Sequence, residues 1–174
     1  MSGPADRRRR CGARNPAGLA WLMPAQSWPT GIVEDDEGLL AILRLARRIA
    51  VLGIKDESRA GEPAHDIPKV MKDSGYEIVP VNPTIDSALG LPAVANLNDI
   101  EGEIDILNVF RASHRVKVHV DDAIALQPKV FWMQLGIRDD ESARRLAAAG
   151  IAVVQDRCLA VEYRRLIGAA AQRH

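Results

Sequence analysis

Small and cationic residues cluster after the first strongly apolar segment of this sequence. Gly53 lies within the apolar run 49–54, and Lys55, Ser58 and Arg59 follow it. A glycine lets the backbone approach a ligand closely, and these side chains can contact anionic oxygens. The pattern is typical of a phosphate-binding turn, although an ordinary strand-to-helix loop also contains glycine and charge.

Two features argue against a nicotinamide enzyme. After Gly53 the next glycine is Gly61, so the G-x-G-x-x-G spacing of dinucleotide-binding proteins is absent. An NAD site also needs an acidic residue after the second strand to bind the ribose 2′-hydroxyl. This sequence has Asn82 and Pro83 there, and Glu77 lies at the opposite end of that segment.

The histidines and carboxylates do not form a catalytic or metal-binding set. His114 and His119 are five residues apart in one predicted helix, whereas two metal ligands on one helix face are typically four apart. His65 lies in a predicted loop, and His174 is the last residue. No Ser–His–Asp order or paired-carboxylate signature stands out. We therefore predict no catalytic residue and no metal ligand.

Alternating segments along the chain determine where these residues must lie. Continuous apolar runs predict strands buried on both faces. The predicted strands are 49–54, 76–82, 105–110, 129–135 and 151–155, and 93–96 is a candidate for a further short strand. The predicted helices are 34–48, 66–74, 114–126, 139–149 and 159–167.

Helix-end signals accompany the second predicted helix. Asp66 is expected to cap it, with Pro68 in its first turn, and Gly75 is expected to end it. Strands alternating with helices predict an α/β fold, a Rossmann-like doubly wound, mainly parallel sheet with helices on both faces. Ligands of such sheets bind beyond the carboxyl ends of the strands, where the polar residues described above lie.

Composition excludes several classes of protein. The chain has 174 residues, 47% of them apolar, with 23 basic and 23 acidic side chains. This composition excludes general disorder, and the zero formal charge gives no reason to expect nucleic acid as a partner. Two cysteines, Cys11 and Cys158, predict a reducing, cytoplasmic location. No segment approaches the roughly 18 apolar residues of a membrane span.

The N-terminal region differs from the rest in charge and proline content. Residues 1–30 contain five arginines, one acidic residue and four prolines. We predict a flexible extension over 1–30 and one domain over 31–174. A secretory signal is disfavoured because the apolar run 18–23 is short and is followed by Pro24. Translation from Met23, which would leave residues 1–22 outside the native protein, remains an alternative.

Six segments, in order, carry a family resemblance. They are IAVLGIK at 49–55, GY and VPVNP within 75–83, LG at 89–90, DI and NVFR within 105–111, W and QLGIR within 132–138, and VVQDRC at 153–158. Together they resemble the small stand-alone CoA-binding proteins, relatives of the CoA-binding domain of the succinyl-CoA synthetase alpha subunit. The resemblance implies a Rossmann-type fold and coenzyme A as the ligand.

The resemblance also implies a set of CoA-binding residues at the strand ends. They are Gly53, Ile54 and Lys55 for the phosphates; Val81, Asn82 and Pro83 for the nucleotide portion; Phe110 and Arg111 for the middle of the groove; and Gln134, Leu135 and Gly136 for the pantetheine end. Ser58 and Arg59 join them as anion-binding candidates from the chemistry of their loop. For Gln134, a structural role at the top of the sheet is the alternative.

Cys158 follows the last predicted strand at the same end of the sheet. A thiol there could form a mixed disulfide with the CoA thiol, and an inert buried cysteine is the alternative.

The predicted function is binding of CoA or acyl-CoA without complete catalytic machinery. The resembling ligase carries its phosphorylated histidine in a second domain and needs another subunit for nucleotide. A nucleotide-dependent enzyme, of the NAD-type oxidoreductase or acyl-CoA-handling kind, and a subunit of a larger acyl-CoA ligase remain alternatives. A protein partner or a homo-oligomer is also open, whereas nucleic acid and membrane are not expected partners.

Overall fold

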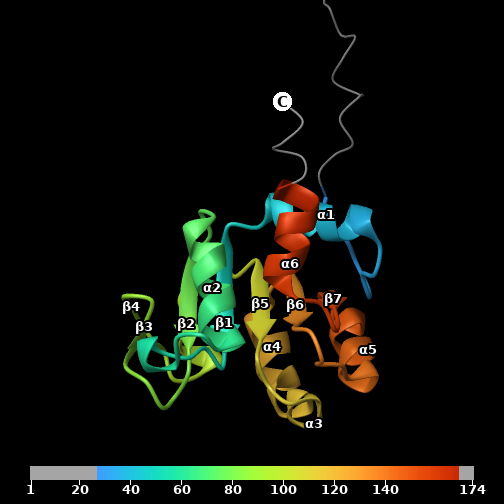
Figure 1. Ribbon diagram of the computed structural model, residues 1–174. Helices are drawn as coiled ribbons and strands as arrows, with labels where there is room; N and C mark the ends of the chain where they lie inside the picture. Colours follow the sequence, from blue (N-terminus) through green and yellow to red (C-terminus); the bar gives the residue numbers. More distant parts are fainter. Residues whose placement is uncertain (1–26, 169–174) are drawn as a thin grey trace, which may run out of the picture.

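A five-stranded parallel sheet forms the centre of the molecule (Figure 1). The computed structural model describes residues 27–168. The spatial order of the strands is β2 (Glu77–Val81), β1 (Arg48–Leu52), β5 (Ile106–Val109), β6 (Val130–Met133) and β7 (Ala152–Val154). The predicted α/β, doubly wound, mainly parallel fold is confirmed.

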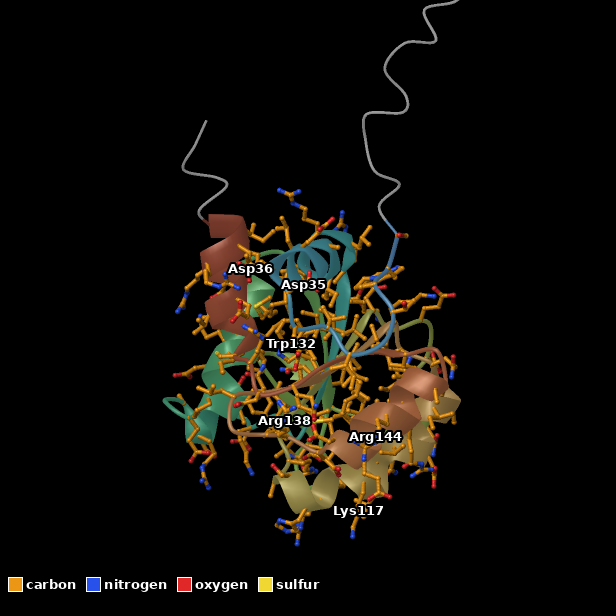
Figure 2. The ribbon with its side chains drawn as sticks, turned by 90° about the vertical axis from the view of Figure 1, so that its right-hand side faces the viewer. Asp35, Asp36, Lys117, Trp132, Arg138 and Arg144 are labelled. Atoms are coloured by element: carbon orange, nitrogen blue, oxygen red, sulfur yellow. The ribbon has the colours of Figure 1, made fainter. Side chains whose placement is uncertain are left out.

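Helices cover both faces of this sheet because successive strand residues point to opposite sides. One apolar cluster includes residues of α1 (Asp36–Leu45), α2 (Pro63–Asp73) and α6 (Leu159–Tyr163), and the other includes residues of α4 (Val120–Leu126) and α5 (Asp140–Ala148). Ile106 of β5 belongs to the first cluster and its neighbour Leu107 to the second. Trp132 of β6 lies in the interior (Figure 2), where its Nε1 donates to the Arg157 carbonyl over 2.8 Å.

Shorter elements complete the described chain. They are the 3₁₀ helices η1 (Glu57–Arg59), η2 (Leu97–Asp99) and η3 (Lys117–His119), the two-residue strands β3 (Ser87–Ala88) and β4 (Leu91–Pro92), the short helix α3 (Ser113–Val116) and the π-helical turn η4 (Arg164–Gly168). The helix predicted at 114–126 is thus divided into α3, η3 and α4. The candidate strand at 93–96 is wrong, since only Val94 pairs there, in an isolated bridge to Val81.

Helix α2 begins earlier than predicted. Glu62 occupies its N-cap position and Pro63 its first turn, so the predicted cap at Asp66 is wrong. Proline suits a first turn because its missing N–H would have no partner there. Pro68 lies inside the helix and cannot donate to the carbonyl of Ala64, four residues earlier. That carbonyl accepts the Lys55 N–H over 3.1 Å, which ties the loop after β1 to α2.

Residues 31–33 extend the sheet beyond β7. Val33 N–H donates to the Val153 carbonyl and Val153 N–H to the Gly31 carbonyl, each over 2.8 Å. The extension predicted for 1–30 lies outside the described residues except for 27–30. Within residues 27–168, no helix combines the length and the apolar character that a membrane crossing requires.

Candidate ligand-binding site

The carboxyl ends of β1 and β5 mark the point where the strand order reverses. The chain passes from β1 to β2 on one side and then to β5 on the other, and such a switch point is where doubly wound sheets bind ligands. Gly53 follows β1 here with a φ of +85°. A Cβ at this position would lie 2.5 Å from the Phe110 carbonyl oxygen. Only glycine therefore lets the two strand ends approach this closely.

A cavity of about 580 Å³ lies at this end of the sheet. Its size is within the roughly 300–1,000 Å³ of small-molecule sites. Its lining residues are Lys55, Asn82, Pro83, Thr84, Arg111, Arg115, Val118 and His119. The cavity thus brings together four residues that the sequence singled out, from the ends of β1, β2 and β5.

The cavity is electropositive because the charged side chains that line it are cations. No carboxylate lines it, and Lys55, Arg111 and Arg115 form no ion pair within residues 27–168. Burial lowers the pKa of the Arg111 guanidinium, and the like charge of Arg115 lowers it further. A bound anion would relieve this repulsion.

His119 adds a titratable group to the same wall. Burial, followed by the charge of Arg111, lowers the pKa of its imidazole, and Asp122 opposes these effects. Arg115, Thr84 and Val118 were not expected at this site, and His119 was considered only as a metal ligand. Arg115 and His119 are four residues apart in a predicted helix, which places them on one face. Since Arg111 precedes Arg115 by the same interval, this spacing could have indicated that the three side chains lie together.

Asn82 shapes the cavity by holding two loops. Its side chain is 4% exposed, and its Nδ2 donates to the Ile54 carbonyl over 2.7 Å. Its Oδ1 accepts from the backbone N–H and the hydroxyl of Thr84, over 3.0 and 2.8 Å. The side chains of Ile54 and Val81 are buried in the core, so these residues can offer a ligand only their backbone groups.

Ser58 and Arg59 do not line the cavity. Both belong to η1, where the Ser58 hydroxyl donates to Asp56 over 2.5 Å and Arg59 Nε donates to Glu62 over 2.6 Å. Their polar groups are therefore already engaged within their own loop.

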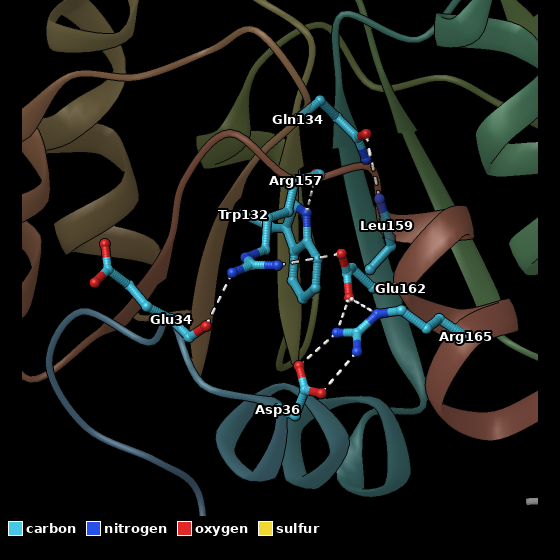
Figure 3. Close-up of polar contacts among 8 residues, drawn as sticks. All are labelled: Glu34, Asp36, Trp132, Gln134, Arg157, Leu159, Glu162 and Arg165. Atoms are coloured by element: carbon cyan, nitrogen blue, oxygen red, sulfur yellow. Dashed lines mark hydrogen bonds and ion pairs between the residues drawn. The ribbon is translucent and has the colours of Figure 1, made fainter.

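The residues predicted for the pantetheine end lie outside the cavity lining. Gln134 is buried, and its Nε2 donates to Asn108 Oδ1 over 2.7 Å. Its Oε1 accepts the Leu159 N–H over 3.3 Å, a contact shown in Figure 3. It thereby joins β5, β6 and α6. Leu135 is 70% exposed, and the Gly136 N–H donates to Asp156 over 2.6 Å.

Two further predicted residues border this end of the sheet. Phe110 packs, partly buried, against the apolar cluster that includes α1, α2 and α6. Cys158 occupies the N-cap position of α6 and is also partly buried against that cluster.

Comparison with known proteins identifies the family. Residues 47–164 match the sequence profile of the family described as CoA binding domain. The chain belongs to this family. The uncharacterized protein YneT of Bacillus subtilis (strain 168) is 43% identical over 122 residues, which cover 70% of this chain and 89% of that protein. The part of the chain matched to the CoA binding domain contains all five strands of the sheet and every residue lining the cavity.

Two solved structures are also similar to this chain. Cell-free ID.343 from Thermus thermophilus is 41% identical, with a TM-score of 0.72, and covers 76% of this chain and 99% of its own. A hypothetical protein from Pyrococcus horikoshii OT3 is 28% identical, with a TM-score of 0.72, and covers 78% of this chain and 94% of its own. The predicted resemblance to small CoA-binding domain proteins is confirmed.

Proposed function

We propose that this chain binds coenzyme A or an acyl-CoA in the cavity at the carboxyl ends of β1, β2 and β5. The observation that carries the proposal is the set of three cations, Lys55, Arg111 and Arg115, that line this cavity and have no carboxylate partner in the described part of the chain. CoA is a polyanion, and membership of the CoA binding domain family supports the same ligand.

The arrangement of the strand ends suggests an orientation for the ligand. The loop after β1 offers the Lys55 ammonium to the pyrophosphate, and Asn82 and Pro83 border the nucleotide portion. The pantetheine arm would then run past Phe110 toward the segment Gln134–Gly136. In this orientation the thiol lies on the side of the sheet that ends at α6.

We propose a binding role without complete catalytic machinery and a cytoplasmic location. Among the described residues, the titratable side chains that line the cavity are three cations and His119, without a carboxylate. Among residues 27–168, no cluster of three or more His, Cys, Asp or Glu side chains could hold a metal ion. The low cysteine content agrees with a reducing compartment.

Calorimetric titration with CoA, acetyl-CoA and NAD tests the proposal. CoA or acetyl-CoA should bind, and Lys55→Ala and Arg111→Ala should each weaken binding by about 1–3 kcal/mol, the range for losing a hydrogen bond to a charged group. Arg145→Ala is the matched control, because Arg145 lies on α5 and pairs with Asp121 over 2.7 Å, outside the cavity. Tight binding of NAD without CoA, or unchanged affinity in both cavity variants, would overturn the proposal.

Cys158 offers a second, separable test. We propose that its thiolate attacks CoA disulfide, forms a mixed disulfide with one CoA and releases the other as a thiolate. Mass spectrometry of non-reduced protein after incubation with CoA disulfide should show one added CoA, absent in Cys158→Ser. No adduct on Cys158 would remove this part of the proposal and leave the binding site intact.

A further inference from the structure

A second cavity, of about 320 Å³, lies at the amino ends of β1 and β2. Its lining includes Ala46 and Arg47, which directly precede β1, and Ser74–Tyr76, which directly precede β2. The proposed CoA site follows these strands instead, and a strand of five residues spans roughly 16 Å. In Figure 1, α1 lies at this end of the molecule and α3 at the other. This amino-end cavity is therefore separate from the proposed CoA site.

The charged side chains that line the amino-end cavity are Arg44 and Arg47. Arg44 forms no ion pair within residues 27–168. Arg47 Nη1 donates to the carbonyls of Arg44 and Ala46, each over 2.8 Å. These carbonyls lie at the C-terminal end of α1, whose partial negative charge would otherwise disfavour an anion. The Nε and Nη2 groups of Arg47 are further donors that a ligand can use.

Aromatic and aliphatic side chains form much of the remaining lining. The rings of Tyr76 and Tyr163 meet edge to face, with their centroids 5.8 Å apart, and Leu43 and Ile167 line the same cavity. The Tyr76 hydroxyl donates to the Leu43 carbonyl over 2.6 Å, and burial raises its pKa to about 12. It therefore stays uncharged at neutral pH. A further ring can join such a pair in an edge-to-face or offset arrangement.

Contacts between elements hold the walls of this cavity in place. Arg165 of η4 donates to both carboxylate oxygens of Asp36 on α1, over 2.6 and 2.7 Å. The π-helical geometry of η4 is rare and is frequently found at functional sites. This turn carries Ile167, four residues after Tyr163, to the same cavity. Walls that are already fixed lose little freedom when a ligand binds.

We propose that the amino-end cavity binds a small aromatic carboxylate. The guanidinium groups of Arg44 and Arg47 hold the carboxylate through charge-assisted, paired hydrogen bonds. The ring of the ligand packs against the tyrosine pair and Ile167. The cavity volume of about 320 Å³ lies within the roughly 300–1,000 Å³ of small-molecule sites. This binding does not depend on CoA.

Benzoate is the probe, and its controls are benzyl alcohol, which lacks the charge, and acetate, which lacks the ring. In ¹H–¹⁵N NMR spectra of the full chain, benzoate should shift the backbone amide signals of Ser74–Tyr76 in a saturable manner. Its affinity should exceed that of either control by about 10-fold or more, the factor expected for a charge-assisted contact. Arg44→Ala should weaken benzoate binding by about 10-fold and leave benzyl alcohol unaffected. Arg164→Ala removes an exposed arginine of η4 outside the lining and should change neither affinity.

Equal affinities for benzoate and benzyl alcohol, or unchanged benzoate binding in Arg44→Ala, would overturn the proposal. Benzoate shifts confined to the residues around Lys55 and Arg111 would also overturn it, because the anion would then occupy the proposed CoA site. Acetate binding as tight as that of benzoate would overturn the aromatic ligand in favour of a general anion site. The comparison of the three probes uses the native protein, so it remains decisive even if Arg44→Ala does not fold.

Discussion

Gly53 is the residue that most directly determines the shape of the proposed site. Its φ of +85° is one that L side chains rarely adopt, and its Cα faces the Phe110 carbonyl at the switch point. Gly150 has the same φ but only open space around its missing side chain. A Cβ at Gly150 would therefore add only the cost of the backbone conformation, whereas a Cβ at Gly53 would add a steric clash as well.

Replacing each glycine with alanine should measure both costs. Gly150→Ala should lower the free energy of unfolding by about 1–2 kcal/mol, the cost of a left-handed conformation. Gly53→Ala should lower it by about 2–5 kcal/mol, because crowding of the Phe110 carbonyl is added. Urea unfolding of both variants provides the measurement, and equal losses would contradict the close approach of β1 and β5.

The pKa of the His119 imidazole depends on the charge of Arg111. Burial and Arg111 both lower the pKa of its imidazole, so an NMR titration should place that pKa below the usual range. Arg111→Ala should raise it, whereas Arg145→Ala should not. A folded-state pKa below the unfolded value means that the unfolded chain takes up the proton first. His119 should therefore reduce stability as the pH falls through the unfolded value of about 6.5 toward the lower folded value.

At the scale of elements, a group of ion pairs ties α6 and η4 to α1 (Figure 3). Arg165 donates to both oxygens of Asp36, over 2.6 and 2.7 Å, and to Glu162 over 2.6 Å. Glu162 is 6% exposed, and its other partner, Arg157, lies 3.4 Å away. The carboxylate of Glu162 therefore depends mainly on Arg165 for its counter-charge.

This dependence predicts an asymmetry between the two ends of the network. Arg165→Ala should destabilise the protein more than Asp36→Ala, because it leaves a buried carboxylate poorly paired, whereas Asp36 is an exposed partner. The midpoints of denaturant unfolding measure this difference, and the midpoint of Arg165→Ala should be the lower of the two. If the order is reversed, the main contribution of Arg165 is its link to α1 and not the neutralisation of Glu162.

The elements also indicate what the sequence can and cannot predict. The five strands were predictable because their apolar runs are continuous, and Asp139 caps α5 as a local signal should, accepting the Ser142 N–H over 3.2 Å. The start of α2 was not predictable, because Glu62 and Pro63 compete with the stronger cap signal of Asp66. The Asp66 carboxylate does not cap the helix but accepts from the side chain of its neighbour, His65, and from the backbone N–H of Gly61.

The proposed site shows the same division between local and tertiary information. Lys55, Asn82 and Arg111 were predictable because each follows a strand, and parallel strands end at one edge. Arg59 was expected beside them, but its nearest acidic neighbour, Glu62, holds it within its own loop. Arg115 lies on the short helix α3 and lines the cavity, and the apolar periodicity of its segment does not reveal this role.

At the scale of the whole molecule, a chain with zero formal charge concentrates at one edge of its sheet three cations that form no ion pair within residues 27–168. Elsewhere many charges are paired at the surface, as in Arg48 with Glu77 and Lys69 with Asp73. Exposed pairs of this kind contribute about 0–1 kcal/mol, so the fold depends mainly on its two apolar clusters. The charge that remains without a partner is available to a ligand.

This charge distribution predicts how CoA should stabilise the protein. A ligand that binds only the folded state at about 100 times its Kd adds about 2.7 kcal/mol to the free energy of unfolding. At a fixed CoA concentration, this gain should shrink as NaCl rises from 0.1 to 1 M, because the screening length falls from about 10 to about 3 Å. Urea unfolding with and without CoA measures the gain, and the Arg111→Ala variant should show both a smaller gain and a weaker salt dependence. A gain that is unaffected by salt would mean that apolar contacts, and not Lys55, Arg111 and Arg115, supply most of the affinity.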